Sequence, residues 1–235
     1  MAETESVGPA LLAERDERLQ RWRRFIDTIT HYVWDLHHHR ALWREMRDAL
    51  IAGSPEDSTF LDHYARLYTE RQLIALRRLV DLDPRSISMA RLLTELAEHP
   101  ETMSWQRHLE LWNLSEESDD PRDQWMVQQA HATFDRYADG DGENVDPNAV
   151  RADLDGWKQA CGKIKQVVDK RIAHLADIRS DKPVPTATYD DLDRAIDAVA
   201  GLVKKYGLLF TAGSIAQMEP VIQGDWKAPF RKPLF

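Results

Sequence analysis

Residues 169–179 read DKRIAHLADIR, and this stretch carries the side chains best suited to chemistry. Lys170, Arg171 and His174 lie within five positions, in a segment whose other periodic residues are apolar. Residues three and four apart on a helix are neighbours, so His174 has two cations within reach. Nearby positive charge favours a neutral imidazole that can act as a base. The cations could hold a phosphate and stabilise the charge that it gains in a transition state.

The same residues also fit a purely structural role. A histidine at the margin of an apolar helix face can pack between helices, while a neighbouring lysine and arginine extend their charged ends to water. Spacing and residue type alone leave both interpretations of His174 open.

Composition predicts a soluble, cytoplasmic protein with a substantial core. The 235 residues are 43% hydrophobic and include eight tryptophans, which suits one large domain or two small ones. With 31 Lys plus Arg against 40 Asp plus Glu, the net charge of −9 argues against a chain-wide nucleic-acid surface but not against a local basic site. The single cysteine, Cys161, is expected to be a small core side chain. We expect neither a secretory signal nor a membrane helix.

Apolar residues recur at helical spacing almost throughout, and no segment with strand periodicity competes. Capping signals stand at Ser88, at Asp120-Pro121, at Asp146-Pro147 and at Thr188 with Asp191. We therefore expect an all-α, antiparallel bundle of about six or seven helices, with residues 1–207 as a single domain and 208–235 as an irregular tail. The expected helices span about 19–50 with a break near 37–39, 58–81, 88–98, 105–112, 121–137, 150–178 and 189–206.

Three other groups of residues invite a functional interpretation. The consecutive histidines 37–39 would point about 100° apart on a helix and cannot converge on one metal, so we expect them at the surface. The loop 139–149, DGDGENVDPNA, lacks the Gly and the final Glu that an EF-hand needs, so we expect a solvated turn. The arginines 71, 77 and 78 near Asp81 favour an ion pair that positions helices. We expect neither a metal nor a cofactor.

Three stretches resemble the HEPN superfamily, closest to its abortive-infection, AbiU-type branch: YTERQLIALRRLVDLDPRSISMARLLTEL, QVVDKRIAHLADIR and TYDDLDRAIDAVAGLVKKYGLLF. The resemblance covers roughly residues 20–207, and its motif-like part is Ile172-Ala173-His174. It implies a helical bundle that dimerises, so that two copies of the motif form one cleft. It also implies metal-independent RNA cleavage or RNA or nucleotide binding in a toxin or phage-defence setting. His174 would be the acid/base, Arg171 the phosphate clamp and Lys170 an assisting nucleotide-binding residue.

The sequence departs from the family pattern at one place. In the family that it resembles, four to six residues stand between an arginine and the histidine, and the positions at that spacing before His174 hold Asp169, Val168 and Val167. Lys170 or Arg171 would have to substitute. The resemblance therefore also allows a catalytically inactive dimeric scaffold that binds a partner protein, such as an antitoxin. A metal-dependent bundle enzyme is disfavoured, because the sequence lacks Glu-x-x-His pairs placed on two facing helices.

Overall fold

The computed structural model describes residues 8–53, 58–172, 186–213, 218 and 224–227. This part of the chain is all-α, as predicted, and the strand-type pairing among the described residues consists of two isolated β-bridges. In chain order the elements are α1 (Pro9–Gly53), α2 (Ser58–Leu79), α3 (Met89–Glu98), the 3-10 turn η1 (Pro100–Thr102), α4 (Trp105–Leu111), α5 (Pro121–Phe134), α6 (Pro147–Ala160), α7 (Gly162–Val167), the π turn η2 (Val168–Ile172) and α8 (Tyr189–Thr211).

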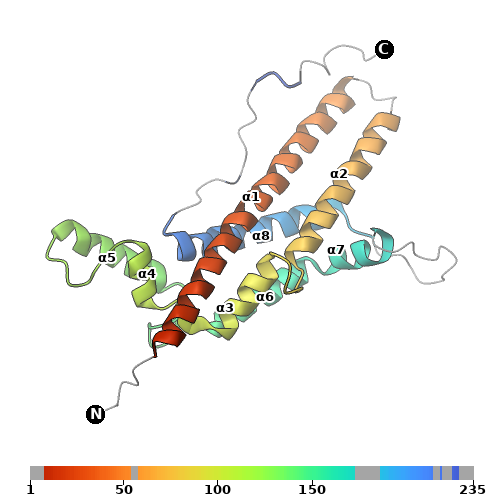
Figure 1. Ribbon diagram of the computed structural model, residues 1–235. Coiled ribbons are helices and arrows are strands. Elements are labelled where there is room, and N and C mark those ends of the chain that lie inside the picture. The colour runs from red at the N-terminus through yellow and green to blue at the C-terminus, as the bar shows by residue number, and fades with distance from the viewer. Residues whose placement is uncertain (1–7, 54–57, 173–185, 214–217, 219–223, 228–235) are drawn as a thin grey trace.

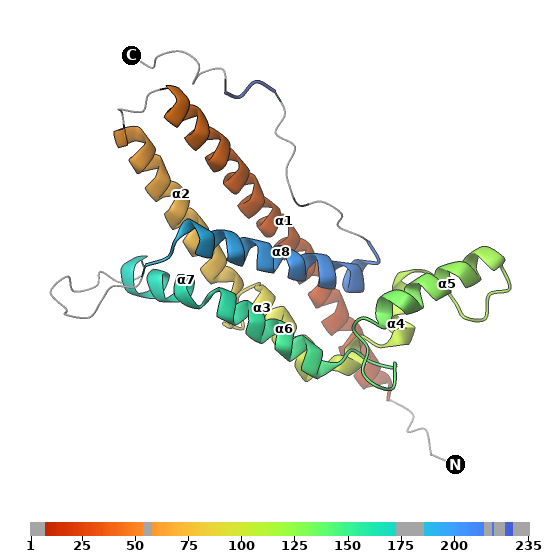
Figure 2. The ribbon, with the colours of Figure 1, turned by 180° about the vertical axis from the view of Figure 1, so that it is seen from behind.

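The bundle is organised around the long helix α1 (Figure 1). Helix α8 crosses α1 and makes the most extensive packing in the fold with it, while α3 packs along α6. Helices α1 and α2 form an antiparallel pair whose connected ends project beyond the other helices, as the view from behind also shows (Figure 2). Helices α4 and α5 form an arm that extends to one side of the bundle.

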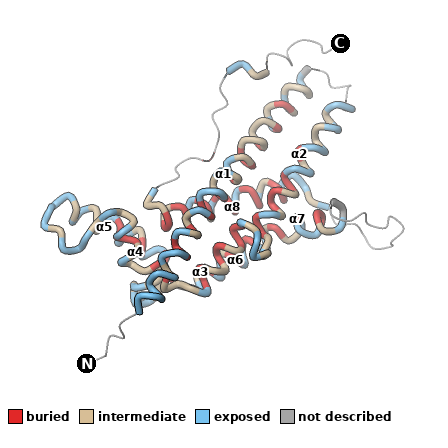
Figure 3. Tube along the Cα trace, in the orientation of Figure 1, coloured by how far each residue is buried: buried red, intermediate tan, exposed pale blue. Residues whose placement is uncertain are grey.

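The main core lies where α1, α3, α6 and α8 cross, and its buried residues follow the apolar stripe predicted for each helix (Figure 3). Trp22 is fully buried and meets Phe210 edge to face at 5.9 Å between ring centroids. The projecting α1–α2 pair has a second, smaller cluster around Trp43, whose ring stacks on Tyr68 at 5.2 Å. Apolar burial of this kind is the main favourable contribution to folding.

The helix starts follow the capping signals read in the sequence. Ser88 accepts a hydrogen bond from the backbone of Arg91, and Asp120 and Asp146 cap the proline-initiated helices α5 and α6. Thr188 and Asp191 form a reciprocal capping box at the start of α8. These side chains satisfy backbone N–H groups that have no partner within the helix, so the local sequence determines where α3, α5, α6 and α8 begin.

The single helix predicted over 150–178 is wrong. Helix α6 ends at Ala160, α7 begins at Gly162, and α7 passes into the π turn η2. This break raises the number of α-helices in the described residues to eight. A glycine lowers helix propensity by about 1 kcal/mol relative to alanine, and the break falls at Gly162. Cys161, at the junction, is fully buried in the core, as predicted.

Two further predictions are corrected. Helix α1 is 45 residues long and has no break near 37–39. His37 is buried instead of facing solvent, and its ring contacts Arg40 one turn on, at 3.0 Å. Helix α8 runs past Gly207 to Thr211, because Leu209 and Phe210 extend its apolar stripe into the core.

The residues after α8 that the structure describes lie against the bundle. Met218 is 3% exposed within the main core, and Trp226 packs against the second cluster. Lys227 pairs with Glu45 of α1 at 2.9 Å. These contacts fasten parts of the predicted tail to α1.

Candidate functional site

Helix α7 and the turn η2 lead directly to the motif predicted from the sequence. Ile164, Val167 and Val168 are buried in the main core and fix this segment against the bundle. Lys163 and Lys165 are exposed on its outer side. A π turn inside a helical segment is uncommon and often marks a functional site, and η2 is where α7 passes into the motif.

The structure describes part of the predicted site. Lys170 is exposed on η2. Arg171 is placed in η2 by its backbone, and its side chain lies outside the described residues. His174 also falls outside them, within 173–185. Their roles therefore remain predictions from the sequence.

The three positions where the family pattern has its arginine are described. Val167 and Val168 are 4% and 6% exposed, so their side chains belong to the core and not to a binding surface. Asp169 is half-exposed and lies between two cations: Arg77 of α2 donates from Nε at 3.0 Å, and Lys165 pairs with it at 3.2 Å. Partial burial would raise the pKa of Asp169, but these hydrogen bonds outweigh it and lower the pKa. Asp169 is therefore held as a carboxylate.

Arg77 of α2 lies beside the motif, a contact that could not be predicted from the sequence. An ion pair with Asp81 was expected, and that pair is present at 3.7 Å, but the closer partner is Asp169. The contact joins the end of α2 to η2 and places a partly exposed guanidinium beside the predicted site. The sequence signal available was the Arg77-Arg78 pair in the last turn of α2, but its partner lies 92 residues away.

Asp191 fixes the other side of this region. Its side chain is 5% exposed and accepts hydrogen bonds from Thr188 as well as from Lys163 of α7, at 3.1 Å. The backbone hydrogen bond from Thr188 is the main cause that lowers the pKa of Asp191, and Lys163 adds to the effect. One carboxylate thus caps α8 and ties it to α7.

The charge of this segment differs from that of the chain. Residues 158–171 contain five cations, namely Lys158, Lys163, Lys165, Lys170 and Arg171, and one carboxylate, Asp169, which gives 5 − 1 = +4 in a chain of net charge −9. The ion pairs of Lys163 and Lys165 leave those side chains 65% and 54% exposed. Exposed pairs of this kind are worth little and can exchange partners. The segment is therefore a local site of positive charge in front of the motif.

The other candidate groups have structural roles. The loop predicted over 139–149 ends at Asp146, just before α6 begins, and it contains Gly142 at φ 75°, a backbone conformation that suits glycine. No group of three His, Cys, Asp or Glu side chains that could hold a metal occurs in the part of the chain that the structure describes. Burial raises the pKa of the Cys161 thiol, which disfavours the reactive thiolate. Among the described helices none has the length and apolar character needed to cross a membrane.

Comparison with known proteins identifies the family. A family model described as AbiU2, of the HEPN class, matches residues 16–228 and so covers most of the chain. Searches of curated proteins and of solved structures returned no significant match. The matched range includes every helix from α2 to α8 and nearly all of α1. The chain therefore belongs to the AbiU2 family, the abortive-infection branch of the HEPN superfamily.

Proposed function

We propose that this protein binds RNA and cleaves it without a metal ion, as part of a phage-defence response. His174 acts as the acid/base, Arg171 holds the scissile phosphate, and Lys170 assists in binding it. The 2′-oxygen attacks the phosphorus as its proton passes to His174, and the bond to the 5′-oxygen breaks as that oxygen takes up a proton. The products of this step are a 2′,3′-cyclic phosphate end and a 5′-hydroxyl end, and addition of one water to the cyclic phosphate then gives a 3′-phosphate.

The observation that carries this proposal is the local charge of α7 and η2. An acidic chain repels a polyanion, so RNA binding requires a concentrated positive site. Residues 158–171 supply one with net charge +4, and it ends at the proposed catalytic residues. Arg77 of α2 adds a sixth cation to the same region, where it pairs with Asp169. RNA entering along α7 would meet Lys170 and Arg171 before it reaches His174.

A homodimer is part of the proposal. A cleft shared by two copies would bring two histidines to one phosphate, so that one accepts the proton of the 2′-hydroxyl while the other donates a proton to the leaving oxygen. The sedimentation of the purified protein would test this association directly.

One observation favours a second function. The family's arginine positions hold two buried valines and an aspartate that is already paired. A chain without that arginine could retain the bundle and the dimer yet bind only a partner protein, such as an antitoxin. This inactive scaffold would differ from the nuclease in neither cleaving RNA nor binding nucleotides.

The test is cleavage of a mixed RNA substrate by purified protein in EDTA. We expect cleavage by the wild type and its loss in His174→Ala. The matched control is His131→Ala, because His131 is an exposed histidine of the α5 arm that contacts Asp135 of its own helix. If the wild type leaves RNA intact, or if His174→Ala cleaves as fast as the wild type, the proposed nuclease is wrong. A wild type that neither cleaves RNA in EDTA nor binds nucleotides would support the scaffold.

A further inference from the structure

Asp169 of η2 is bonded by cations from two different helices. Arg77, in the last turn of α2, donates from Nε to Oδ1 of Asp169 at 3.0 Å. Lys165 of α7 lies 3.2 Å from the other carboxylate oxygen, Oδ2. Lys170, the next residue of η2, is exposed. One carboxylate thus holds an arginine that is distant in the sequence against the lysines of α7 and η2.

The guanidinium of Arg77 has more donors than its ion pairs with described residues use. An arginine carries five N–H donors in a planar fork. The hydrogen bond to Asp169 uses the donor on Nε, whereas Asp81 lies 3.7 Å from Nη1, which is longer than an ordinary hydrogen bond. The side chain is 28% exposed, so part of it reaches solvent. A phosphate oxygen could therefore accept from this guanidinium while Asp169 still holds Nε.

The balance of charge around Asp169 favours an anion. The described cations are Arg77, Lys165 and Lys170, and the carboxylates are Asp81 and Asp169, which gives 3 − 2 = +1. Exposed ion pairs contribute little to stability, so an incoming phosphate can share these cations with the carboxylates at small cost. A positive excess of this kind attracts a polyanion.

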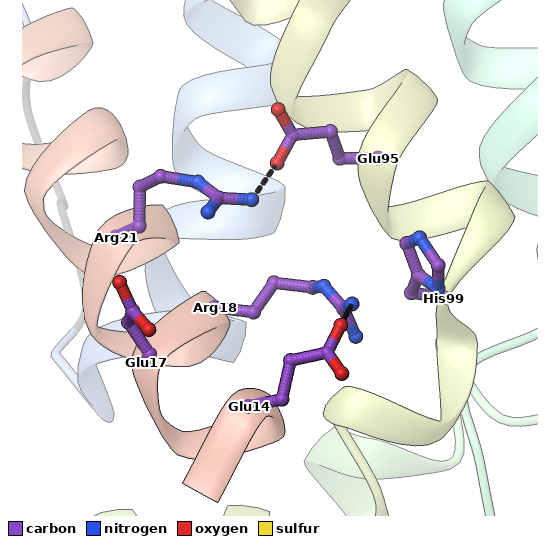
Figure 4. A pocket seen from close by; sticks show the side chains of 6 residues that line it. All are labelled: Glu14, Glu17, Arg18, Arg21, Glu95 and His99. Carbon is purple, nitrogen blue, oxygen red and sulfur yellow. Dashed lines mark hydrogen bonds and ion pairs between the residues drawn. The ribbon is translucent and has the colours of Figure 1, made fainter. Parts of the chain in front are cut away.

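A pocket of about 300 Å³ between α1 and the C-terminal end of α3 has the opposite balance (Figure 4). Its arginines, Arg18 and Arg21, face three glutamates, Glu14, Glu17 and Glu95, which gives 2 − 3 = −1. Arg18 donates to Glu14 at 2.6 Å, and Arg21 donates to Glu95 at 2.7 Å. Arginine alone therefore does not make a phosphate site, and the surroundings of Arg77 suit an anion better than this pocket does.

We infer that Arg77 is a phosphate-binding residue of the proposed RNA site and that Asp169 positions it. The inference rests on the proposed function, because RNA supplies the phosphate. The planar fork of an arginine can donate two parallel hydrogen bonds to a phosphate, which a lysine cannot do. Arg77 stands on a well-fixed helix, since its neighbours Leu76 and Leu79 are buried in the main core. Helix α2 thus presents a held guanidinium to RNA that lies along α7 and η2.

Two substitutions distinguish phosphate binding from a purely structural ion pair. Arg77→Gln and Asp169→Asn weaken the same pair, so a structural role predicts that both weaken RNA binding. If Arg77 binds phosphate, the effects differ in sign. Arg77→Gln removes a donor to phosphate, whereas Asp169→Asn removes a negative charge and keeps an amide oxygen that can accept from Nε.

The probe is a short single-stranded RNA with methylated 2′-oxygens, which cannot attack the phosphorus, so binding to the full-length protein is measured without cleavage. In fluorescence anisotropy, Arg77→Gln should bind about tenfold more weakly, the size expected for the loss of one charge-assisted hydrogen bond. Its slope of log affinity against log salt should fall by about 0.7, the value for one phosphate contact on a single strand. Asp169→Asn should bind at least as tightly as the wild type.

The matched control is Arg71→Gln, which makes an equal change of charge on the same helix. Arg71 pairs with Asp35 at 3.2 Å, and both side chains are exposed. This variant should keep the affinity and the salt slope of the wild type. Melting temperatures of all three variants check that each one is folded, because an exposed ion pair contributes at most about 1 kcal/mol.

The inference is overturned if Arg77→Gln binds the probe as the wild type does, if Arg71→Gln weakens binding equally, or if Asp169→Asn weakens binding too. Cleavage of unmodified RNA is scored separately. Cleavage by the wild type with unchanged binding in Arg77→Gln overturns this inference alone. Probe binding that depends on Arg77, without any cleavage, supports this inference and overturns the proposed cleavage. A wild type that does not bind the probe overturns this inference and the proposed RNA binding together.

Discussion

Acidification should weaken the fold through one buried histidine in the α4–α5 arm. His108 is fully buried, and its ring packs against Phe134 at 5.3 Å, Trp112 at 5.9 Å and Trp105 at 6.2 Å between centroids. Neither ring nitrogen makes a hydrogen bond of ordinary geometry with a described residue. Burial lowers the pKa of His108 to about 4, and the carbonyl of Leu209 opposes this only in part.

The sign and size of the effect follow from the two pKa values. The pKa of 6.5 in the unfolded chain lies above the value of about 4 in the fold. The unfolded state therefore takes up a proton first, and stability is complete above about pH 6.5 and declines as the pH falls towards 4. At about pH 5, roughly 97% of unfolded chains but only roughly 10% of folded ones carry this proton. With 1.36 kcal/mol per pKa unit, this difference lowers the free energy of unfolding by about 2 kcal/mol.

The assay is urea denaturation of wild type and His108→Leu at about pH 7.5 and at about pH 5. Leucine is close in size to histidine but cannot titrate, so the variant should lose about 2 kcal/mol less than the wild type on acidification. It should be at least as stable as the wild type at neutral pH, because the variant removes poorly satisfied buried ring nitrogens, and an unsatisfied buried polar group costs about 1–3 kcal/mol.

The control is His131→Gln, which removes an exposed histidine of the same arm. This variant should keep the full pH dependence of the wild type. If His108→Leu and the wild type lose equal stability between the two pH values, then His108 is not held neutral by burial, and the reasoning is refuted.

Three further predictions concern α7 and its surroundings. Asp191→Ala removes one half of the α8 capping box and the partner of Lys163. It should lower the free energy of unfolding by about 1–2 kcal/mol in urea, and an unchanged midpoint would contradict this. Val168→Arg places an arginine at a family arginine position but forces its guanidinium into a side-chain site that is 6% exposed. The variant should be destabilised by more than about 2 kcal/mol. Stability equal to that of the wild type would contradict the burial of this side chain. If RNA binds along α7, the double variant Lys158→Ala/Lys165→Ala should reduce the slope of log affinity against log salt by about 1 to 1.5, as measured by fluorescence anisotropy. The control Arg122→Ala, on the α5 arm, should keep the slope of the wild type. An equal slope in both variants would mean that RNA binds elsewhere.

Much of the fold could be predicted because its signals are local. An apolar stripe depends on residues three and four apart, and a cap depends on residues two or three apart. The start of α6 at Asp146-Pro147 and the capping box of Thr188 with Asp191 were therefore predictable from a few neighbouring letters. The family was also accessible from the sequence, because the Ile172-Ala173-His174 neighbourhood is local as well.

The candidate site was predictable only as residue types near one another in the chain. Lys170 is exposed, and the roles of Lys170, Arg171 and His174 stay predictions. The burial of Val167 and Val168 could be anticipated from periodicity, but the guanidinium beside Asp169 could not. Arg77 lies 92 residues earlier in the chain, and no local pattern states which of several arginines will meet which carboxylate.

The sequence by itself thus determined the helical class and the capped helix starts, since both depend on interactions within about one or two turns of helix, and it was enough to identify the family. The tertiary structure decided the break at Gly162, the burial of His37, the extension of α8 through Phe210 and the pair of Arg77 with Asp169. These features depend on which helix faces cross in space. Packing against distant segments overrides local propensity whenever it buries an apolar face or pairs a charge.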